Sequence, residues 1–261
     1  MNGSERLRIM RENTAISDTG SYTAADGTEV TLPENGKALS DRTFMLLPEK
    51  KTYPTECIRK TPFRIADESV SADTITCIQQ LRRTVSGEII ALNFANANVP
   101  GGGYRFGGDA QEESLCRCSL LYAAIAPHKE YYRWHHLHPT PFYSDRMLIS
   151  PDIPIIRHMD GTLTAEPIRC TFVTCAAVNR RIAKLMLIPD HFINKTMNRR
   201  IHGILAAMAE RAPEAIVLGA FGCGAFGNRR KAVYPMIENA VNSLIPDHIS
   251  VFFAVPRKDD T

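Results

Sequence analysis

The sequence predicts a layered α/β domain built on a substantially parallel sheet. Apolar runs of strand length alternate along the chain with segments in which apolar residues recur at helical spacing. The run IIALNF at Ile89–Phe94 is of the apolar kind that is buried on both faces of a sheet. Ligands of such sheets bind at the carboxyl ends of the strands, and two glycine-rich loops fall at such ends here.

Composition limits the class of protein. The chain has 261 residues, 44% hydrophobic and 23% charged, which is typical of a folded protein of one or two domains. A formal net charge of +3 is too small for a dedicated nucleic-acid binder, so no stable nucleic-acid partner is expected. No apolar run approaches the length of about 18 residues that a membrane span needs, and the charged N-terminus does not resemble a secretory signal. We therefore expect a cytoplasmic monomer without a membrane partner. Its seven cysteines, an odd number, are expected to be reduced and buried.

Helices are predicted where apolar residues recur every three or four positions, and strands where short apolar runs lie between turn formers. Ser71 caps the start of one helix, and Leu115, Leu121 and Ile125 recur at helical spacing in the next. Up to residue 125 the expected elements are a helix over the first 20 residues, a loop at 20–27, a short strand at 28–32, mixed turn-rich chain at 33–70, a helix at 71–83, the strand at 89–94 and a helix at 111–125.

The second half of the chain begins with residues 127–146, which are rich in histidine, proline and aromatic residues and are expected to form an irregular loop. The elements expected after it are strands at 146–149, 153–156 and 170–175, a helix at 192–210, a strand at 215–218, a helix at 231–244 and a strand at 249–255.

The first glycine-rich loop, NFANANVPGGGYRFGGDAQEE at residues 93–113, joins the apolar strand to a helix. Its glycines let backbone amides approach a ligand, and the helix start that follows favours an anion. Gln111, Glu112 and Glu113 stand at that start. The helix dipole explains one acid there but not two adjacent ones. A bound phosphate would raise the proton affinity of such an acid, and the helix start would lower it. This balance suits glycoside or phosphate-ester chemistry.

The second glycine-rich loop, GAFGCGAFGN at residues 219–228, contains a formal match to the dinucleotide fingerprint G-x-G-x-x-G. We reject nicotinamide chemistry because Asp247, about 20 positions on, precedes the next strand instead of ending it. The chain also leaves 261 minus 247, or 14, residues after it, too few for the rest of a dinucleotide-binding sheet. Binding of a phosphate group by the loop remains the prediction.

No metal and no cofactor are expected. His135, His136 and His138 are spaced unlike any recognised ligand set, so a solvated or substrate-facing loop is the better interpretation. Cys116 and Cys118 point to different faces of one helix and are not expected to chelate.

The spacing of GGG, seven residues and QEE at residues 101–113 resembles the signature of the poly(ADP-ribose) glycohydrolases, a branch of the macrodomains. The stretches RENTAISDTGSYTAADGTEV, FYSDRMLISPDIPIIRHMDG and LGAFGCGAFGN resemble the short bacterial type, so that the resemblance covers roughly residues 6–255. It implies a three-layer α/β/α macrodomain with a mixed, largely parallel sheet and an N-terminal helical extension. The expected organisation is a single catalytic domain over 1–261, with residues 1–70 packed on a core at 71–255.

The resemblance also implies an activity and a site. Members of the family cleave ribose–ribose glycosidic bonds of poly(ADP-ribose) and release ADP-ribose without a metal. By position, Glu113 would be catalytic, Glu112 would hold ribose hydroxyls, Asn96 would contact the distal ribose and Phe226 would stack on the ligand. The other residues implied to bind substrate are Gly101, Gly102, Gly103, Gln111, Gly222, Cys223, Gly224, Ala225 and Gly227.

Two departures from the family pattern leave the substrate open. Asn228 is followed by Arg229, Arg230 and Lys231 where Asp-Pro is expected, and CAAVN at residues 175–179 lacks an expected proline. The candidate partners are ADP-ribose, poly(ADP-ribose) or an ADP-ribosylated protein. Alternatives are a hydrolase that removes single ADP-ribose units from protein or nucleic acid, and a non-catalytic reader. Retention of both acids favours an enzyme.

Overall fold

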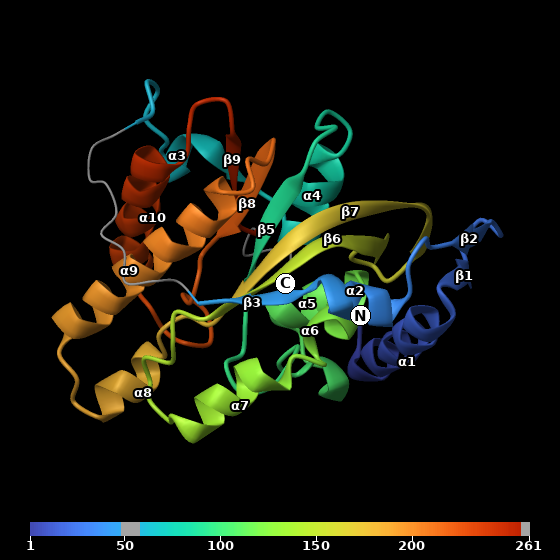
Figure 1. Ribbon diagram of the computed structural model, residues 1–261, viewed down its shortest axis with the longest axis horizontal. Helices are drawn as coiled ribbons and strands as arrows, with labels where there is room; N and C mark the ends of the chain where they lie inside the picture. The colour runs from blue at the N-terminus through green and yellow to red at the C-terminus, as the bar shows by residue number, and fades with distance from the viewer. Residues whose placement is uncertain (48–57, 257–261) are drawn as a thin grey trace.

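The computed structural model describes residues 1–47 and 58–256, which form a seven-stranded sheet between helical layers (Figure 1). Across the sheet the strands run β3 (Phe44–Leu46), β6 (Met147–Arg157), β7 (Leu163–Cys175), β5 (Ile89–Phe94), β8 (Ala215–Gly219), β9 (Ser250–Ala254) and β4 (Ser69–Val70). The pairings from β7 through β5, β8 and β9 to β4 are parallel, whereas β3–β6 and β6–β7 are antiparallel. The predicted mixed, largely parallel sheet is confirmed.

Alternation along the strands divides the core into two clusters. In β5, Ile89 and Ala91 belong to one cluster and Ile90 and Leu92 to the other, because successive side chains of a strand point to opposite faces. The helices that contribute to the first cluster are α1 (Gly3–Thr19), α2 (Gly36–Arg42), α4 (Thr74–Leu81), α5 (Gln111–Cys118), α6 (Leu121–Ile125) and α7 (Lys129–Leu137). Those of the second are α3 (Ile65–Glu68), α8 (Arg180–Leu185), α9 (Asp190–Ala209) and α10 (Arg230–Leu244). This is the predicted three-layer α/β/α architecture.

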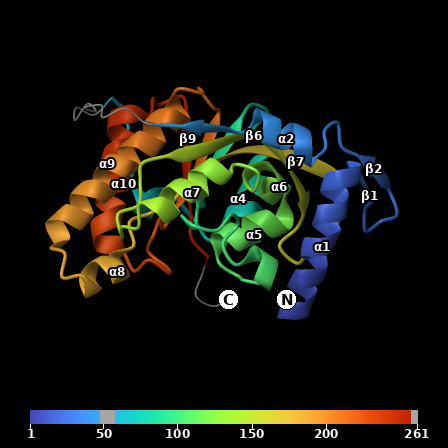
Figure 2. The ribbon, with the colours of Figure 1, turned by 60° about the horizontal axis from the view of Figure 1, so that its bottom comes forward.

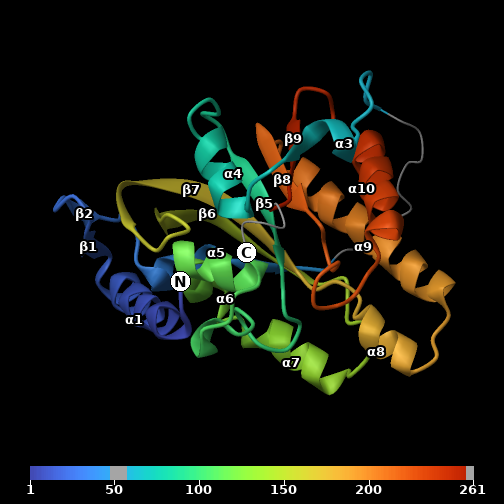
Figure 3. The same ribbon diagram turned by 180° about the vertical axis from the view of Figure 1, so that it is seen from behind.

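The two ends of the molecule are formed by distant parts of the chain (Figure 2). Helix α1 and the hairpin of β1 (Ser21–Thr23) and β2 (Glu29–Thr31) lie at one end, and α8, α9 and α10 lie at the other. Seen from behind, α7 and α8 are at the lower edge, below the sheet (Figure 3).

The N-terminal region is part of the sheet as well as a layer on it, because both edge strands, β3 and β4, come from it. Helix α1 is also tied to the core through buried polar groups. Arg157 donates from Nε to Asn13 Oδ1 at 2.9 Å and from Nη2 to Glu12 Oε2 at 2.9 Å. Asn13 Nδ2 in turn donates to the carbonyl of Arg117 at 2.8 Å, in the last turn of α5.

The helix predicted at 111–125 is wrong in one respect, because it is broken into α5 and α6. Ser119 Oγ donates to the Leu115 carbonyl at 2.7 Å and accepts from the Leu121 amide at 3.1 Å. Ser119 also bridges to Ile155, and the Leu120 amide donates to the Pro154 carbonyl at 3.1 Å. The backbone between the helices therefore pairs with β6 instead of continuing the helix.

The irregular loop predicted at 127–146 is also wrong, since it contains α7. Tyr131, Tyr132 and His135 are buried on that helix, so the aromatic residues that suggested a loop form an apolar helical face. Other corrections are smaller. Residues 21–23 form β1 instead of a loop, and Asp73, not Ser71, caps α4. The strands predicted at 146–149 and 153–156 form the single bulged strand β6. The elements that were not predicted are α2, α3, α8, β3, β4 and a short 3₁₀ turn at Tyr104–Phe106.

Within the described residues, six cysteines are free, and all of them except the partly buried Cys223 are buried. Burial raises the pKa of the Cys118 and Cys175 thiols to about 12, which keeps both protonated. Cys57 lies outside the described residues. None of the helices in the described ranges has both the length and the apolar character needed to cross a membrane.

Candidate active site

A cleft lies at the carboxyl ends of the neighbouring parallel strands β5 and β8. The two glycine-rich loops leave from these strand ends, and residues from both line the cleft. The lining residues are Phe94, Ala95, Asn96, Ala110, Gln111, Glu112, Glu113, Ala177, Ala220, Gly222, Gly224, Ala225 and Phe226. The prediction that the two loops meet at one edge of the sheet is confirmed.

Gln111 fixes the start of α5 against the end of β5. Its Oε1 accepts the Phe94 amide at 2.9 Å, and its Nε2 donates to the Leu92 carbonyl at 2.8 Å. Helix α5 has no side-chain cap, so these two hydrogen bonds of Gln111 hold the helix start and its two acids at the cleft. Gln111 therefore positions the two glutamates, in addition to lining the cleft.

Glu112 is buried among hydrogen-bond donors. Its Oε2 accepts the Asn96 amide at 2.7 Å, and its Oε1 accepts Asn93 Nδ2 at 3.3 Å. Burial raises the pKa of this carboxyl from 4.5 to about 8, the hydrogen bonds oppose the shift, and the like charge of Glu113 adds to it. At neutral pH the folded protein therefore favours a proton on Glu112.

The raised pKa of Glu112 predicts a pH dependence of stability. Between its ordinary pKa and about 8, the folded state binds more protons at Glu112 than the unfolded state does. The free energy of unfolding should therefore fall as the pH rises through this window. We expect Glu112→Gln to flatten that slope in urea titrations from pH 5 to 8.5, whereas Glu166→Gln, at an exposed position, should keep the wild-type slope. An unchanged slope in Glu112→Gln would contradict this assignment.

Glu113 presents one bound and one unbound oxygen. Its Oε1 accepts the Gly103 amide at 2.7 Å, whereas its Oε2 is buried and has no partner among the described residues. Leaving a buried polar atom unpaired costs about 1–3 kcal/mol, so the orphaned oxygen points to a ligand in the cleft. A Cβ on Gly102, where φ is +55°, would lie 2.5 Å from Glu113 Oε1 and 3.1 Å from Glu112 Oε2. The glycine thus allows the backbone to approach both acids.

Asn96 organises the turn that follows β5. Its Oδ1 accepts the amides of Asn98 at 2.9 Å and Val99 at 3.1 Å, which fixes the side chain. Its Nδ2 donates no hydrogen bond to a group in the described part of the chain, and the residue lines the cleft. This amide is free to donate to a ligand.

The second glycine-rich loop closes the other side of the cleft. A Cβ on Gly222, where φ is +70°, would lie 2.5 Å from Ala177 Cβ, so glycine allows the loop to pack against the chain that follows β7. Asn228 Nδ2 donates to the carbonyls of Val178 at 2.8 Å and Gly222 at 3.1 Å and holds these segments together. Phe226 is half-buried, lines the cleft and lies 5.8 Å from the Tyr143 ring.

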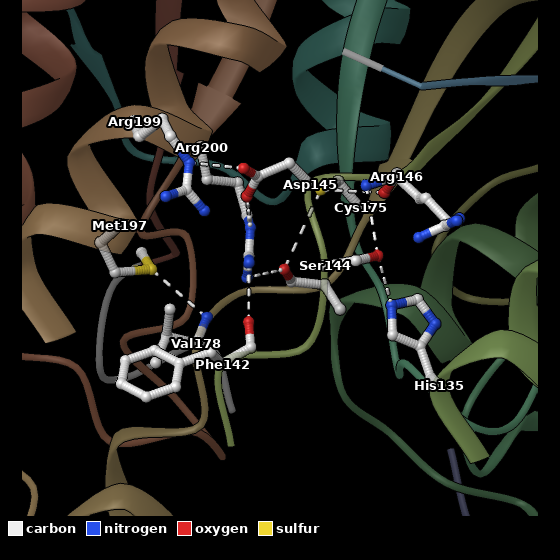
Figure 4. A network of polar contacts seen from close by, with 11 residues as sticks. His135, Phe142, Ser144, Asp145, Arg146, Cys175, Val178, Met197, Arg199 and Arg200 are labelled. Atoms are coloured by element: carbon white, nitrogen blue, oxygen red, sulfur yellow. Dashed lines mark hydrogen bonds and ion pairs between the residues drawn. The ribbon is translucent and has the colours of Figure 1, made fainter. Parts of the chain in front are cut away.

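A buried polar network joins the segments at 142–146 and 175–178 to helix α9 (Figure 4). Arg200, 1% exposed, donates to the carbonyls of Ala176 at 2.8 Å and Phe142 at 2.6 Å, and from Nε to Asp145 Oδ1 at 2.9 Å. It thereby anchors the segment before Ala177. Asp145 also accepts Arg199 Nε at 2.6 Å.

His135 belongs to the same network and is neither a solvated nor a metal-binding residue, which corrects its predicted place in a substrate-facing loop. Its Nδ1 donates to the Tyr131 carbonyl at 2.9 Å, which leaves Nε2 to accept the Ser144 hydroxyl at 2.8 Å. Burial lowers the pKa of His135 to about 4. No group of histidines, cysteines and acids in the described ranges is arranged to hold a metal.

Most of the predicted site residues line this cleft, but not all. Gly101, Gly102, Gly103, Cys223 and Gly227 are absent from its lining, and the amide of Gly103 is engaged by Glu113. Asn93 was missed. It is fully buried and links Glu112 to Thr174 Oγ1 at 3.2 Å, and a single polar side chain in an otherwise apolar strand was the available signal. Tyr143 and Ala177 lie in stretches that the sequence analysis discussed, FYSDRMLISPDIPIIRHMDG and CAAVN, but neither residue was predicted to belong to the site.

Comparison with known proteins identifies the family of the chain. A family model described as the microbial-type PARG catalytic domain matches residues 10–158. No curated protein matches the chain significantly. The solved poly(ADP-ribose) glycohydrolase of Thermomonospora curvata superposes with a TM-score of 0.86 at 30% identity, over 98% of this chain and 94% of that one. The same enzyme bound to the inhibitor ADP-HPD gives 0.86 at 29% identity, over 97% and 93%.

The poly(ADP-ribose) glycohydrolase of Deinococcus radiodurans in complex with ADP-ribose superposes with a TM-score of 0.73 at 28% identity, over 88% of this chain and 93% of that one. The family model spans 158 minus 9, or 149, of the 261 residues, which is more than half of the chain. The chain therefore belongs to the family of microbial-type poly(ADP-ribose) glycohydrolases, which are glycosidases.

Proposed function

We propose that this chain hydrolyses the ribose–ribose glycosidic bonds of poly(ADP-ribose) and releases ADP-ribose, with Glu113 as the general acid and base. The observation that carries the proposal is the buried Oε2 of Glu113, which has no partner in the described chain and belongs to a cleft formed by two glycine-rich loops. Relatives over nearly the whole chain have been solved with ADP-ribose or an inhibitor, which supports the same ligand here.

The geometry supports one placement of the ligand. The two glycine-rich loops flank the cleft, and the second loop, whose Gly222, Gly224, Ala225 and Phe226 line it, suits a diphosphate. The distal ribose then lies between Glu113 and Asn96, whose free Nδ2 can donate to it. Glu112, protonated at neutral pH because burial raises its pKa to about 8, can hold a ribose hydroxyl.

The proposed reaction uses Glu113 twice, first as a general acid and then as a general base. Protonated Glu113 donates to the departing ribose oxygen while the bond from that oxygen to the anomeric carbon of the distal ribose breaks. The developing oxocarbenium charge is stabilised by the substrate's own diphosphate. Glu113, now ionised, takes a proton from the water that attacks the same carbon, which restores its protonated form.

Phe226 is proposed to stack on the bound ADP-ribose. We expect Phe226→Ala to weaken ADP-ribose binding by roughly 1–3 kcal/mol, as for other aromatic residues that stack on nucleotides. Phe106→Ala, which removes an 83% exposed aromatic ring of the first loop, should leave the affinity unchanged. Calorimetry on both folded variants measures the effect. Equal affinities in Phe226→Ala and wild type would assign Phe226 to ordinary packing under the loop.

The function is tested with purified protein that has been treated exhaustively with a chelator, because we also propose that no metal takes part. The substrates are poly(ADP-ribose) and proteins or oligonucleotides that carry single ADP-ribose units on arginine, glutamate or a base. We expect ADP-ribose release from the polymer without an added divalent ion. Release from single-unit substrates alone would make the chain a mono-ADP-ribosyl hydrolase, and binding without any cleavage would make it a non-catalytic reader. Activity that is restored only by a divalent ion would overturn metal independence.

We also propose a cytoplasmic monomer whose partners are poly(ADP-ribose) and ADP-ribosylated protein. The free cysteines of the described chain, with thiol pKa values raised by burial, support a reducing compartment.

A further inference from the structure

Four exposed cations border the second glycine-rich loop: Arg181, Arg229, Arg230 and Lys231, called here the rim cluster. The backbone amide of Arg181 donates to the carbonyl of Phe226 at 3.1 Å, and a Cβ on Gly227 would lie 2.7 Å from Arg181 Cγ. The other three cations directly follow Asn228. The rim cluster therefore adjoins the loop that carries Phe226, which lines the same cleft as Glu113.

The charges of the rim cluster are uncompensated. None of its side chains forms an ion pair or a hydrogen bond within the described ranges, although the neighbouring Arg180 and Lys184 both pair with Asp190, at 2.8 Å and 3.1 Å. The first turns of α8 and α10 contain no acidic residue. Four like charges thus border this loop, and none of them has an ion-pair partner among the described residues.

Three of these cations are also placed where they oppose folding. Arg229 is the N-cap of α10, and Arg230 and Lys231 are its first residues. A helix start carries partial positive charge, so cations there are unfavourable. A local arrangement that lowers stability at the edge of a functional cleft is typical of a group retained for binding.

We infer that the rim cluster binds the diphosphate of a polymer unit adjacent to the one that occupies the cleft, and thereby favours polymer over single ADP-ribose units. The inference rests on the proposed function. Poly(ADP-ribose) carries a diphosphate in every unit, and arginine guanidinium groups bind phosphate oxygens in a bidentate manner. A compact group of cations also raises the encounter rate with an anionic chain.

The test compares Arg229→Gln/Arg230→Gln/Lys231→Gln with a control that removes the same charge elsewhere. The control is Arg11→Gln/Arg64→Gln/Arg83→Gln, at exposed positions without an ion pair in the described structure. Both variants lower the formal net charge from +3 to 0, by removing three positive charges. Two substrates are used: poly(ADP-ribose), and an aryl glycoside of ADP-ribose, which has no second diphosphate.

We expect the rim variant to lose about tenfold or more in kcat/KM on the polymer at low salt, and much of the salt dependence of this value. Its turnover of the aryl glycoside should stay at the wild-type level, and its Tm should rise because the helix start is relieved of charge. The control variant should keep the wild-type ratio of the two substrates. Arg181→Gln alone should show a smaller effect of the same kind.

Three results would overturn the inference: an equal loss on both substrates, an equal loss in the control variant, or an unchanged polymer rate. A binding assay without turnover, which measures the polymer affinity of the wild type and of the rim variant, tests the rim cluster separately from the proposed function. If the wild type cleaves neither substrate, the proposed function fails, while a weaker polymer affinity of the rim variant still supports the rim cluster.

Discussion

Replacing Glu113 by Gln is expected to lower kcat on poly(ADP-ribose) by a factor on the order of 10²–10⁴, the usual cost of losing a general acid or base. Glutamine keeps the shape of the side chain, and its amide oxygen can still accept the Gly103 amide that Glu113 Oε1 accepts at 2.7 Å. Only the titratable proton is lost. ADP-ribose affinity should therefore change little.

The measurement is paired, with single-turnover rates on the polymer and calorimetric affinity for ADP-ribose. Glu130→Gln is the matched control, because it removes an exposed glutamate from the first turn of the neighbouring helix α7. This control should behave as the wild type in both assays. If Glu113→Gln binds and turns over like the wild type, Glu113 has no part in the chemistry.

Arg200→Leu is expected to destabilise the fold by about 3–5 kcal/mol, the range for breaking one side of a buried ion pair. The side chain of Arg200 is fully buried, and its removal leaves the carbonyls of Ala176 and Phe142 without their donor. Asp145 would keep only its exposed partner, Arg199. The segment that carries Ala177 into the cleft would lose its anchor, so ADP-ribose affinity should fall as well.

The neighbouring Arg199 provides the control for this prediction. It binds the other oxygen of the same Asp145 carboxylate, but its side chain is 50% exposed. Exposed pairs contribute at most about 1 kcal/mol, so Arg199→Leu should lower the free energy of unfolding far less. Urea unfolding of both variants measures the difference. Equal losses would show that burial of Arg200 is not what makes its contacts strong.

The parts of the fold that could be predicted depend on short stretches of sequence. The apolar run of β5 matches the predicted bounds, and periodicity placed α9, α10, β8 and β9 within a few residues. The break between α5 and α6 could not be predicted, because it depends on the pairing of Ser119 with Ile155, 36 positions later. The short edge strands β3 and β4 exist only because neighbouring strands give them partners.

The candidate site was predicted by motif and completed by packing. The QEE spacing identified Glu112 and Glu113, and the parallel sheet predicted that the two glycine-rich loops would meet. The sequence did not reveal that Gln111 clamps α5 to β5, or that residues 101–103 lie next to the acids instead of lining the cleft. Those roles depend on contacts between side chains and distant backbone groups.

The position of the two edge strands has a consequence for biosynthesis. Strand β4 pairs with β9 through Ser69 and Phe253, which are 253 minus 69, or 184, residues apart. At a synthesis rate of about 5–20 residues per second, β4 leaves the ribosome roughly 10–40 s before its partner exists. The nascent chain must therefore wait with an unpaired strand, and the domain can close cooperatively only once translation has delivered its last strand. Slow folding, governed by contacts between residues far apart in the sequence, is the behaviour expected of this topology.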